Sequence, residues 1–214
     1  MFSGLISSRH LRVIGVFLWL AALVALPGCW VYSVEPLYEA HLSHPDPDLA
    51  FDQSLVGSWS RLDDDCLWTL TIAANQRAYK LTMAPAPECK SDEKTTRYEG
   101  HLLKLDGHRF LDVRPQSDGV CDLCLPLHSF FLVSQESDSF TLIPVDDTWL
   151  TQAIDSKRVA LAHLQHQDRS HTEPPDPVVL TAPSNELKDF MRKYADDKAV
   201  FKTDSDHNFT FKRK

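Results

Sequence analysis

The chain has 214 residues, 43% of them hydrophobic and 24% charged, which is typical of globular rather than disordered proteins. Its formal net charge is −8. Residues 1–28 hold two arginines and no acid, so the remaining chain carries 20 basic and 30 acidic residues, a formal charge of −10. Such a charge repels phosphate backbones, and we therefore expect no nucleic-acid partner.

The N-terminal residues have the pattern of an export signal. Arg9 and Arg12 precede residues 13–26, a stretch of 14 residues without a charge. As a helix this stretch would span roughly 21 Å, which is short of the ~30 Å hydrocarbon core of a bilayer. The pattern therefore predicts that residues 1–28 are a signal peptide rather than a membrane-spanning helix.

Leu26-Pro27-Gly28-Cys29 resembles the lipobox of bacterial lipoproteins, although Pro27 is less common at its position than Ala or Ser. The resemblance implies cleavage before Cys29, acyl chains (palmitate among them) on the new N-terminus, and attachment to a membrane. Trp30 follows instead of Asp, so the usual inner-membrane retention signal is absent. In a cell with two membranes we expect the outer membrane, with the body facing the periplasm. The alternatives are an ordinary cleaved signal peptide or an uncleaved anchor, with Cys29 incidental.

The rest of the chain is predicted to form three parts. Residues 29–52 are expected to be a lipidated tether, because His44-Pro45-Asp46-Pro47-Asp48 favours extended backbone. Residues 53–202 are expected to be a single β-rich domain, and residues 203–214 a polar tail.

Period-two patterns within the β-rich domain predict three hairpins. In the first, residues 66–74 and 77–84 turn at Asn75-Gln76, which sets Trp68 opposite Met83. The second joins 95–105 to 109–114 through Asp106-Gly107, a strong turn dipeptide. The third joins 127–134 to 139–145 near Glu136-Ser137 and sets Val133 opposite Phe140, Phe131 opposite Leu142 and Phe130 opposite Ile143. Its two faces are both apolar, so each must be covered.

The last third of the domain has fewer signals. A short helix is expected over 147–154, a loop over 163–177 and a strand over 178–180. Ser184 is predicted to be the N-cap of a helix that continues to about residue 196, and a last strand is expected at 199–202. The helix carries one apolar stripe, formed by Leu187, Phe190, Met191 and Tyr194.

Gly57-Ser58-Trp59 opens the meander of strands and resembles the G-x-W of lipocalin-like proteins. The resemblance implies a mainly β fold, an antiparallel meander closed into a barrel or half-barrel with a C-terminal helix, in which Trp59 plugs one end. The arginine that partners this tryptophan in the family has no counterpart that the sequence identifies. The insert at 147–175 departs from the family pattern, and Trp59 is alternatively a core aromatic of another sandwich.

Four cysteines remain after Cys29, and an even number outside the cytoplasm favours disulfides. The first hairpin places position 66 opposite 85, which predicts a Cys66–Cys89 bond and leaves Cys121–Cys124 as a second, structural or redox-active pair. Zinc bound by Cys121, Cys124 and His128, with His101 or His108, is the alternative. We expect no metal and no other cofactor.

No catalytic motif such as G-x-S-x-G or H-E-x-x-H is present, so we do not expect an enzyme. We expect a membrane-anchored, non-enzymatic module that binds a small apolar ligand, or alternatively a protein-interaction or assembly factor of the cell envelope. The predicted ligand-lining residues are Trp59, Trp68, Tyr79, Phe131 and Phe140. The alternative for these five side chains is that they fill a solid core.

Overall fold

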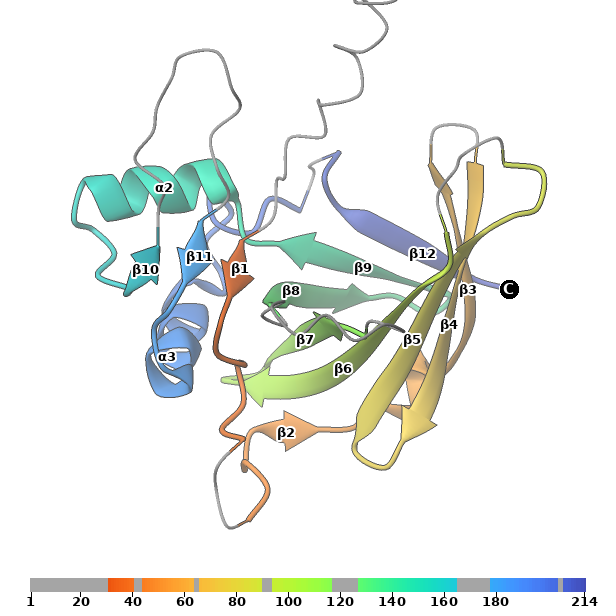
Figure 1. Cartoon of the computed structure of the whole chain (residues 1–214), viewed down its shortest axis with the longest axis horizontal. Helices are drawn as coiled ribbons and strands as arrows, with labels where there is room; N and C mark the ends of the chain where they lie inside the picture. Colours follow the sequence, from red (N-terminus) through yellow and green to blue (C-terminus); the bar gives the residue numbers. More distant parts are fainter. Residues whose placement is uncertain are drawn as a thin grey trace, which may run out of the picture. The chain divides into compact units, whose positions relative to one another are not determined.

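The computed structural model describes residues 31–40, 44–63, 66–89, 94–116, 127–164, 178–203 and 206–214. Its main feature is a closed barrel of eight antiparallel strands (Figure 1). The chain forms seven of them in order and adds the eighth at its C-terminus. They are β3 (Gly57–Asp63), β4 (Cys66–Asn75), β5 (Ala78–Pro85), β6 (Thr96–Leu105), β7 (His108–Pro115), β8 (His128–Gln135), β9 (Ser139–Pro144) and β12 (Phe209–Arg213).

The barrel closes because β12 inserts between β3 and β9, while β9 also pairs with β8. Full closure removes the free strand edges that an open sheet would expose. The predicted mainly β fold with an antiparallel barrel and a C-terminal helix is thereby confirmed. β12 lies in the segment that we predicted to be a polar tail, and the strand predicted at 199–202 is a turn instead.

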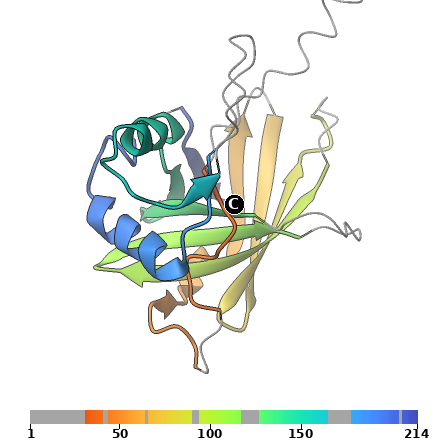
Figure 2. The same ribbon diagram turned by 60° about the vertical axis from the view of Figure 1, so that its left-hand side comes forward.

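Four short strands and two helices are added to the barrel. β1 (Tyr32–Ser33) pairs with the start of β8 and with β11 (Val179–Leu180), which in turn pairs with β10 (His163–Leu164). β2 (Leu49–Ala50) pairs with β6. The helices α2 (Asp147–Asp155) and α3 (Ser184–Tyr194) lie on one side of the barrel (Figure 2), and a 3-10 turn, η2 (Gln53–Leu55), precedes β3. Neither these helices nor any other helical stretch of the described chain has the length and apolarity needed to cross a bilayer.

The body has two apolar cores, one inside the barrel and one between the barrel and the helices. The β8–β9 hairpin contributes to both. Phe131 and Val133 point into the barrel, whereas Phe130 and Ile143 pack in the outer core with Leu187 of α3. The prediction that both faces of this hairpin are covered is confirmed.

The first and third hairpins pair in registers that differ by two residues from the predicted ones. Trp68 pairs with Pro85 instead of Met83, and Val133 pairs with Leu142 instead of Phe140. A shift of two leaves every side chain on its predicted face, so the apolar pattern alone does not distinguish the two registers. The turns decide, and the first is centred on Gln76 and Arg77, with Gln76 at a φ of 58°.

The middle hairpin has the predicted turn. Asp106 and Gly107 both take positive φ, 49° and 92°, as a two-residue type I′ turn requires. Residue Ser184 was predicted to be an N-cap, but it is the first helical residue of α3. Pro183 occupies the cap position, and the Ser184 hydroxyl donates to the carbonyl oxygen of Tyr38 instead.

The described part of the predicted tether is folded onto the body. We call residues 31–40 and 44–52 the strap. Val31 and Leu37 are buried in the outer core, Asp46 is buried as well, and β1 and β2 add strand pairs. These residues of the predicted tether are therefore packed against the folded body.

Candidate functional site

The residues predicted to line a ligand cavity are all buried on the inner side of the barrel. Trp59, Tyr79, Phe131 and Phe140 belong to the interior core. Trp68 is buried as well and lies on the same face of β4 as Leu70 and Ile72. The hairpin pattern placed Trp68, Tyr79, Phe131 and Phe140 on this side, and the lipocalin-like resemblance placed Trp59 there.

Within the described part of the barrel interior lies a small apolar cavity. Its volume is about 10 Å³, whereas typical ligand pockets measure roughly 300–1,000 Å³. Such a space is close to the minimum that one water molecule needs. Its lining is formed by Leu55, Ile72, Tyr79, Leu81, Leu111, Val133, Phe140 and Leu142. Of the five predicted aromatic residues, Tyr79 and Phe140 line this cavity, which is too small for a typical ligand.

Trp59 makes a hydrogen bond, an aromatic contact and a cation–π contact in the interior core. Its Nε1 donates to the carbonyl oxygen of Leu55 at 2.9 Å, and the ring of Phe140 meets it edge to face with centroids 4.7 Å apart. The guanidinium of Arg213 lies 4.3 Å from the centroid of the Trp59 ring. Arg213 was missed because the tail was not predicted to form a strand, although Phe209-Thr210-Phe211-Lys212 has the alternation of one.

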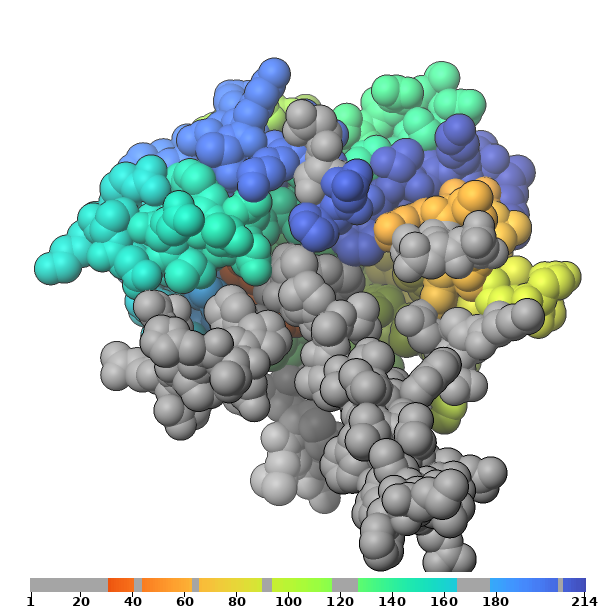
Figure 3. Space-filling model, turned by 90° about the horizontal axis from the view of Figure 1, so that it is seen from above, coloured from red at the N-terminus to blue at the C-terminus, as the bar shows by residue number. Residues whose placement is uncertain are grey.

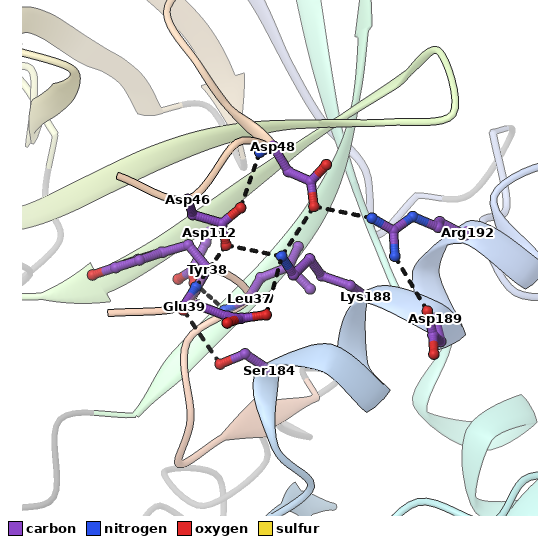
Figure 4. A network of polar contacts seen from close by, with 10 residues as sticks. All are labelled: Leu37, Tyr38, Glu39, Asp46, Asp48, Asp112, Ser184, Lys188, Asp189 and Arg192. Carbon is purple, nitrogen blue, oxygen red and sulfur yellow. Dashed lines mark hydrogen bonds and ion pairs between the residues drawn. The ribbon is translucent and has the colours of Figure 1, made fainter. Parts of the chain in front are cut away.

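The second feature is a group of buried or half-buried polar side chains where the strap crosses β7, β8 and α3, which we call the polar seam. It consists of Asp46, Asp48, Asp112, His128 and Lys188 (Figure 4 draws all of them except His128). Asp112 accepts the backbone N–H of Leu37 at 2.7 Å through Oδ2, and its Oδ1 lies 2.7 Å from Nδ1 of His128. Asp112 therefore joins the strap to two barrel strands.

Lys188 makes the other half of the polar seam. Its side chain points between two carboxylates, with Nζ 2.8 Å from Asp46 and 3.0 Å from Asp48 (Figure 4). Asp46 also accepts the backbone N–H groups of Glu39 and Asp48, and Arg192 donates to Asp48 at 2.9 Å. Only 5% of Lys188 and 2% of Asp46 are exposed, so this ion pair is sealed from water.

Burial and hydrogen bonding act in opposite directions on this pair. Burial by itself would raise the pKa of Asp46, but the hydrogen bonds from Lys188, Glu39 and Asp48 outweigh it and hold that pKa below its usual value. Burial would lower the pKa of Lys188, and its hydrogen bonds to Asp46 and Asp48 raise it instead. Both groups are therefore charged at neutral pH.

A half-buried aromatic cluster adjoins the polar seam. The ring of Tyr38 lies 4.2 Å from that of His101 and 6.5 Å from that of His128. Burial lowers the pKa of His101, although the nearby Glu99 and Asp112 oppose this effect. Burial also raises the pKa of Tyr38, and the same two carboxylates add to the rise.

The polar seam contains the residue types of an acid–base site, but these side chains are not accessible to a substrate. Ser33 faces His128 across the β1–β8 pair, and its buried hydroxyl has no hydrogen-bond partner among the described residues. Ser33, His128 and Asp112 are therefore neighbours in space, and they are the residue types of a serine–histidine–aspartate triad. Ser33 itself belongs to the strap, all three side chains are buried, and no hydrogen bond joins Ser33 to His128. The hydrogen bond from Leu37 N–H to Asp112 holds the strap against the barrel at this place.

The cysteine predictions fall partly within the described chain. Cys66 and Cys89 form the predicted disulfide, with Cα atoms 5.2 Å apart, at the end of the barrel where β4 begins. Cys29, Cys121 and Cys124 lie outside the described residues. In the described ranges, no three His, Cys, Asp or Glu side chains are arranged to hold a metal ion, and His128 and His108 instead face Asp112 and Asp196.

The polar seam itself was not predicted. Lys188 occupies a helix position where a lysine is usually solvated, and its partner Asp46 is 142 residues away in the chain. Comparison with protein-family models, with curated proteins and with solved structures finds no match to this chain.

Proposed function

We propose that this protein is an envelope lipoprotein, anchored through Cys29, whose solid barrel binds another envelope protein rather than a small ligand. The observation that carries the choice is the small size of the cavity beside Tyr79 and Phe140 inside the barrel, about 10 Å³. A drug-sized or lipid-sized apolar molecule would need roughly 300 Å³ or more, which the barrel would have to gain by repacking its aromatic core. A rigid, filled barrel is instead suited to presenting its outer surface to a partner.

Two further observations support the proposal. The lipobox-like Leu26–Cys29 stands directly before the folded body, whose first described residue, Val31, is already buried. The barrel is also an antiparallel one, as the lipocalin-like resemblance implies, and the guanidinium of Arg213 lies over the ring of Trp59 as a partner cation. The resemblance concerns the fold and implies no specific activity.

The small apolar ligand remains the second candidate, because lipocalin-like barrels are suited to such molecules. Binding of such a ligand would require an open state of the barrel in which Phe131 and Phe140 take other positions. The two candidates differ in what accompanies the protein when it leaves the envelope.

Labelled palmitate supplied to the producing cells tests the anchor, with Cys29→Ala as the matched control. The proposal predicts label on the native protein and none on the variant. Cross-linking in intact envelopes then tests the partner, and we expect a discrete protein adduct. A native protein without label would refute the anchor, and co-purified lipid with no protein adduct would favour the ligand candidate.

A further inference from the structure

We propose that the partner protein docks on α2 and α3 through an acidic segment. The docking surface consists of two half-buried aromatic side chains, Trp149 and Tyr194, and two exposed cations, Arg158 and Lys193. We call these four residues the aromatic–cation patch. This inference rests on the protein-binding function proposed above, and it names the place and the chemistry of that contact.

The helices α2 and α3, teal and blue on the left of Figure 3, bring three aromatic rings together. Phe190 and Tyr194 are four residues apart on α3, so they share one face of that helix, and their ring centroids are 5.0 Å apart. Trp149 of α2 meets the ring of Tyr194 edge to face at 5.1 Å and lies 6.5 Å from that of Phe190. Phe190 is buried in the outer core, so the half-buried pair of Trp149 and Tyr194 rests on that core.

Each ring of this pair has a cation over it. The chain turns back after α2, because Lys157 takes a positive φ of 60° and the backbone N–H of Arg158 then bonds to the last turn of the helix. This turn places the Arg158 guanidinium 5.4 Å from the centroid of the Trp149 ring. On α3, the ammonium group of Lys193 lies 5.0 Å from the centroid of the Tyr194 ring. Two cations are thereby held at one aromatic pair.

Neither cation forms an ion pair within the part of the chain that the structure describes. Arg158 donates from Nε to the hydroxyl of Ser156 at 3.2 Å, and Lys193 contacts the ring beneath it. By contrast, the neighbouring Arg192 is bound to the carboxylate of Asp48. A ring face attracts a cation but leaves most of its N–H groups without an acceptor. Arg158 and Lys193 therefore keep donors for the carboxylates of a partner.

The carboxylates that lie nearby in the sequence have partners of their own. Asp146 caps the N-terminus of α2 and pairs with Lys202, and Asp197, just past α3, accepts a backbone N–H two residues further on. These acids stabilise the ends of the two helices. They are not paired with either cation of the aromatic–cation patch.

The composition of the patch is that of a protein contact. Trp, Tyr and Arg are the residue types most enriched at the positions that dominate the binding energy of protein interfaces. Two exposed cations favour an acidic partner by charge complementarity. A bilayer would instead be entered by protruding apolar side chains. The large apolar side chains that are exposed among the described residues lie outside α2 and α3; they are Phe51, Leu62, Leu67 and Leu164.

Site-specific cross-linking of the full-length protein in intact envelopes tests the docking surface. The photoreactive residue p-benzoylphenylalanine replaces Gln152, which is exposed and follows Trp149 by three residues on α2. The control position is Thr71, which is exposed on β4, a strand that contributes nothing to the outer core beneath the helices. We expect an adduct with one envelope protein from position 152 and none from position 71. In the cross-linked segment of the partner, Asp and Glu should outnumber Lys and Arg.

Charge reversal tests the chemistry of the contact. Arg158→Glu combined with Lys193→Glu keeps both rings and should reduce the adduct from position 152 by roughly tenfold or more. Lys80→Glu combined with Lys212→Glu is the matched control and should leave the adduct unchanged, because both lysines are exposed on barrel strands outside the patch. All four substitutions change exposed side chains, so both double variants are expected to fold.

The outcomes separate this inference from the protein-binding function. No adduct at position 152, while a general amine cross-linker captures a protein in the same envelopes, refutes the docking surface only. No protein adduct with either reagent refutes the protein-binding function itself. An equal adduct from position 71, one that survives the charge reversal at 158 and 193, or one formed with lipid or with a second copy of this chain overturns the inference. A cross-linked segment in which basic residues prevail overturns the acidic partner.

Discussion

Replacing Lys188 by methionine removes the cation of the polar seam while keeping the length of the side chain. Asp46 would then remain ionised and buried, with only the backbone N–H groups of Glu39 and Asp48 to compensate its charge. Breaking one partner of a buried pair costs about 3–5 kcal/mol. Because two hydrogen bonds to Asp46 survive, we expect the lower end, about 3 kcal/mol.

For a chain of this size, a loss of about 3 kcal/mol lowers the melting temperature by roughly 6–12 °C. Urea unfolding followed by circular dichroism should show a lower midpoint with an unchanged slope. Lys193→Met is the matched control, because Lys193 lies on the exposed side of the same helix, and it should change stability by less than about 0.5 kcal/mol.

The difference between the native protein and Lys188→Met should also depend on pH. The pKa of Asp46 is lowered in the folded state, so the stability it contributes is present above its ordinary pKa of 3.8 and is lost as the pH falls further. The pKa of Lys188 is raised, so its contribution is lost only above its ordinary value of 10.5. If Lys188→Met costs no more stability than Lys193→Met at pH 7, the ion pair between Lys188 and Asp46 does not hold the strap.

Three other changes probe the barrel and its surroundings. Replacing both Cys66 and Cys89 by alanine opens a loop with a sequence separation of 23, and should cost about 3 kcal/mol in urea unfolding; an unchanged midpoint would show that the bond is not needed. Gly100→Ala brings a new Cβ within 2.6 Å of Leu81 Cδ1 and should cost about 1–3 kcal/mol by overpacking, which a neutral result would contradict. His101 has a lowered pKa, so the folded state favours its neutral form and stability should fall as the pH drops below 6.5. His101→Gln should flatten that fall, measured by melting at pH 7 and pH 5, and an identical profile would argue against burial as its cause.

Local patterns were sufficient to predict the strands of the three hairpins. Their alternation also placed Trp68, Tyr79 and Phe131 on the inner face, and the Cys66–Cys89 bond followed from the proximity of the two strand ends. The exact registers did not follow, because pairings that differ by two residues bury the same side chains. Backbone geometry at the turns, such as the positive φ of Gln76, selects between them.

Features that depend on distant parts of the chain were not predicted. The strap contributes strands of only two residues, and its burial relies on Asp46 and Asp112 meeting groups far away in sequence. β12 is paired with β3 and β9 rather than with an adjacent hairpin partner, so its role depends on barrel closure. Whether aromatic side chains enclose a pocket or fill it depends on volume, which periodicity does not report.

Native mass spectrometry of the protein extracted from its own envelope tests the central claim most directly. A lipid-anchored protein with a solid barrel predicts a chain that begins at Cys29, carries covalent acyl groups and retains no other small molecule. A chain that begins elsewhere, or one that carries a stoichiometric apolar ligand released on unfolding, would contradict the account.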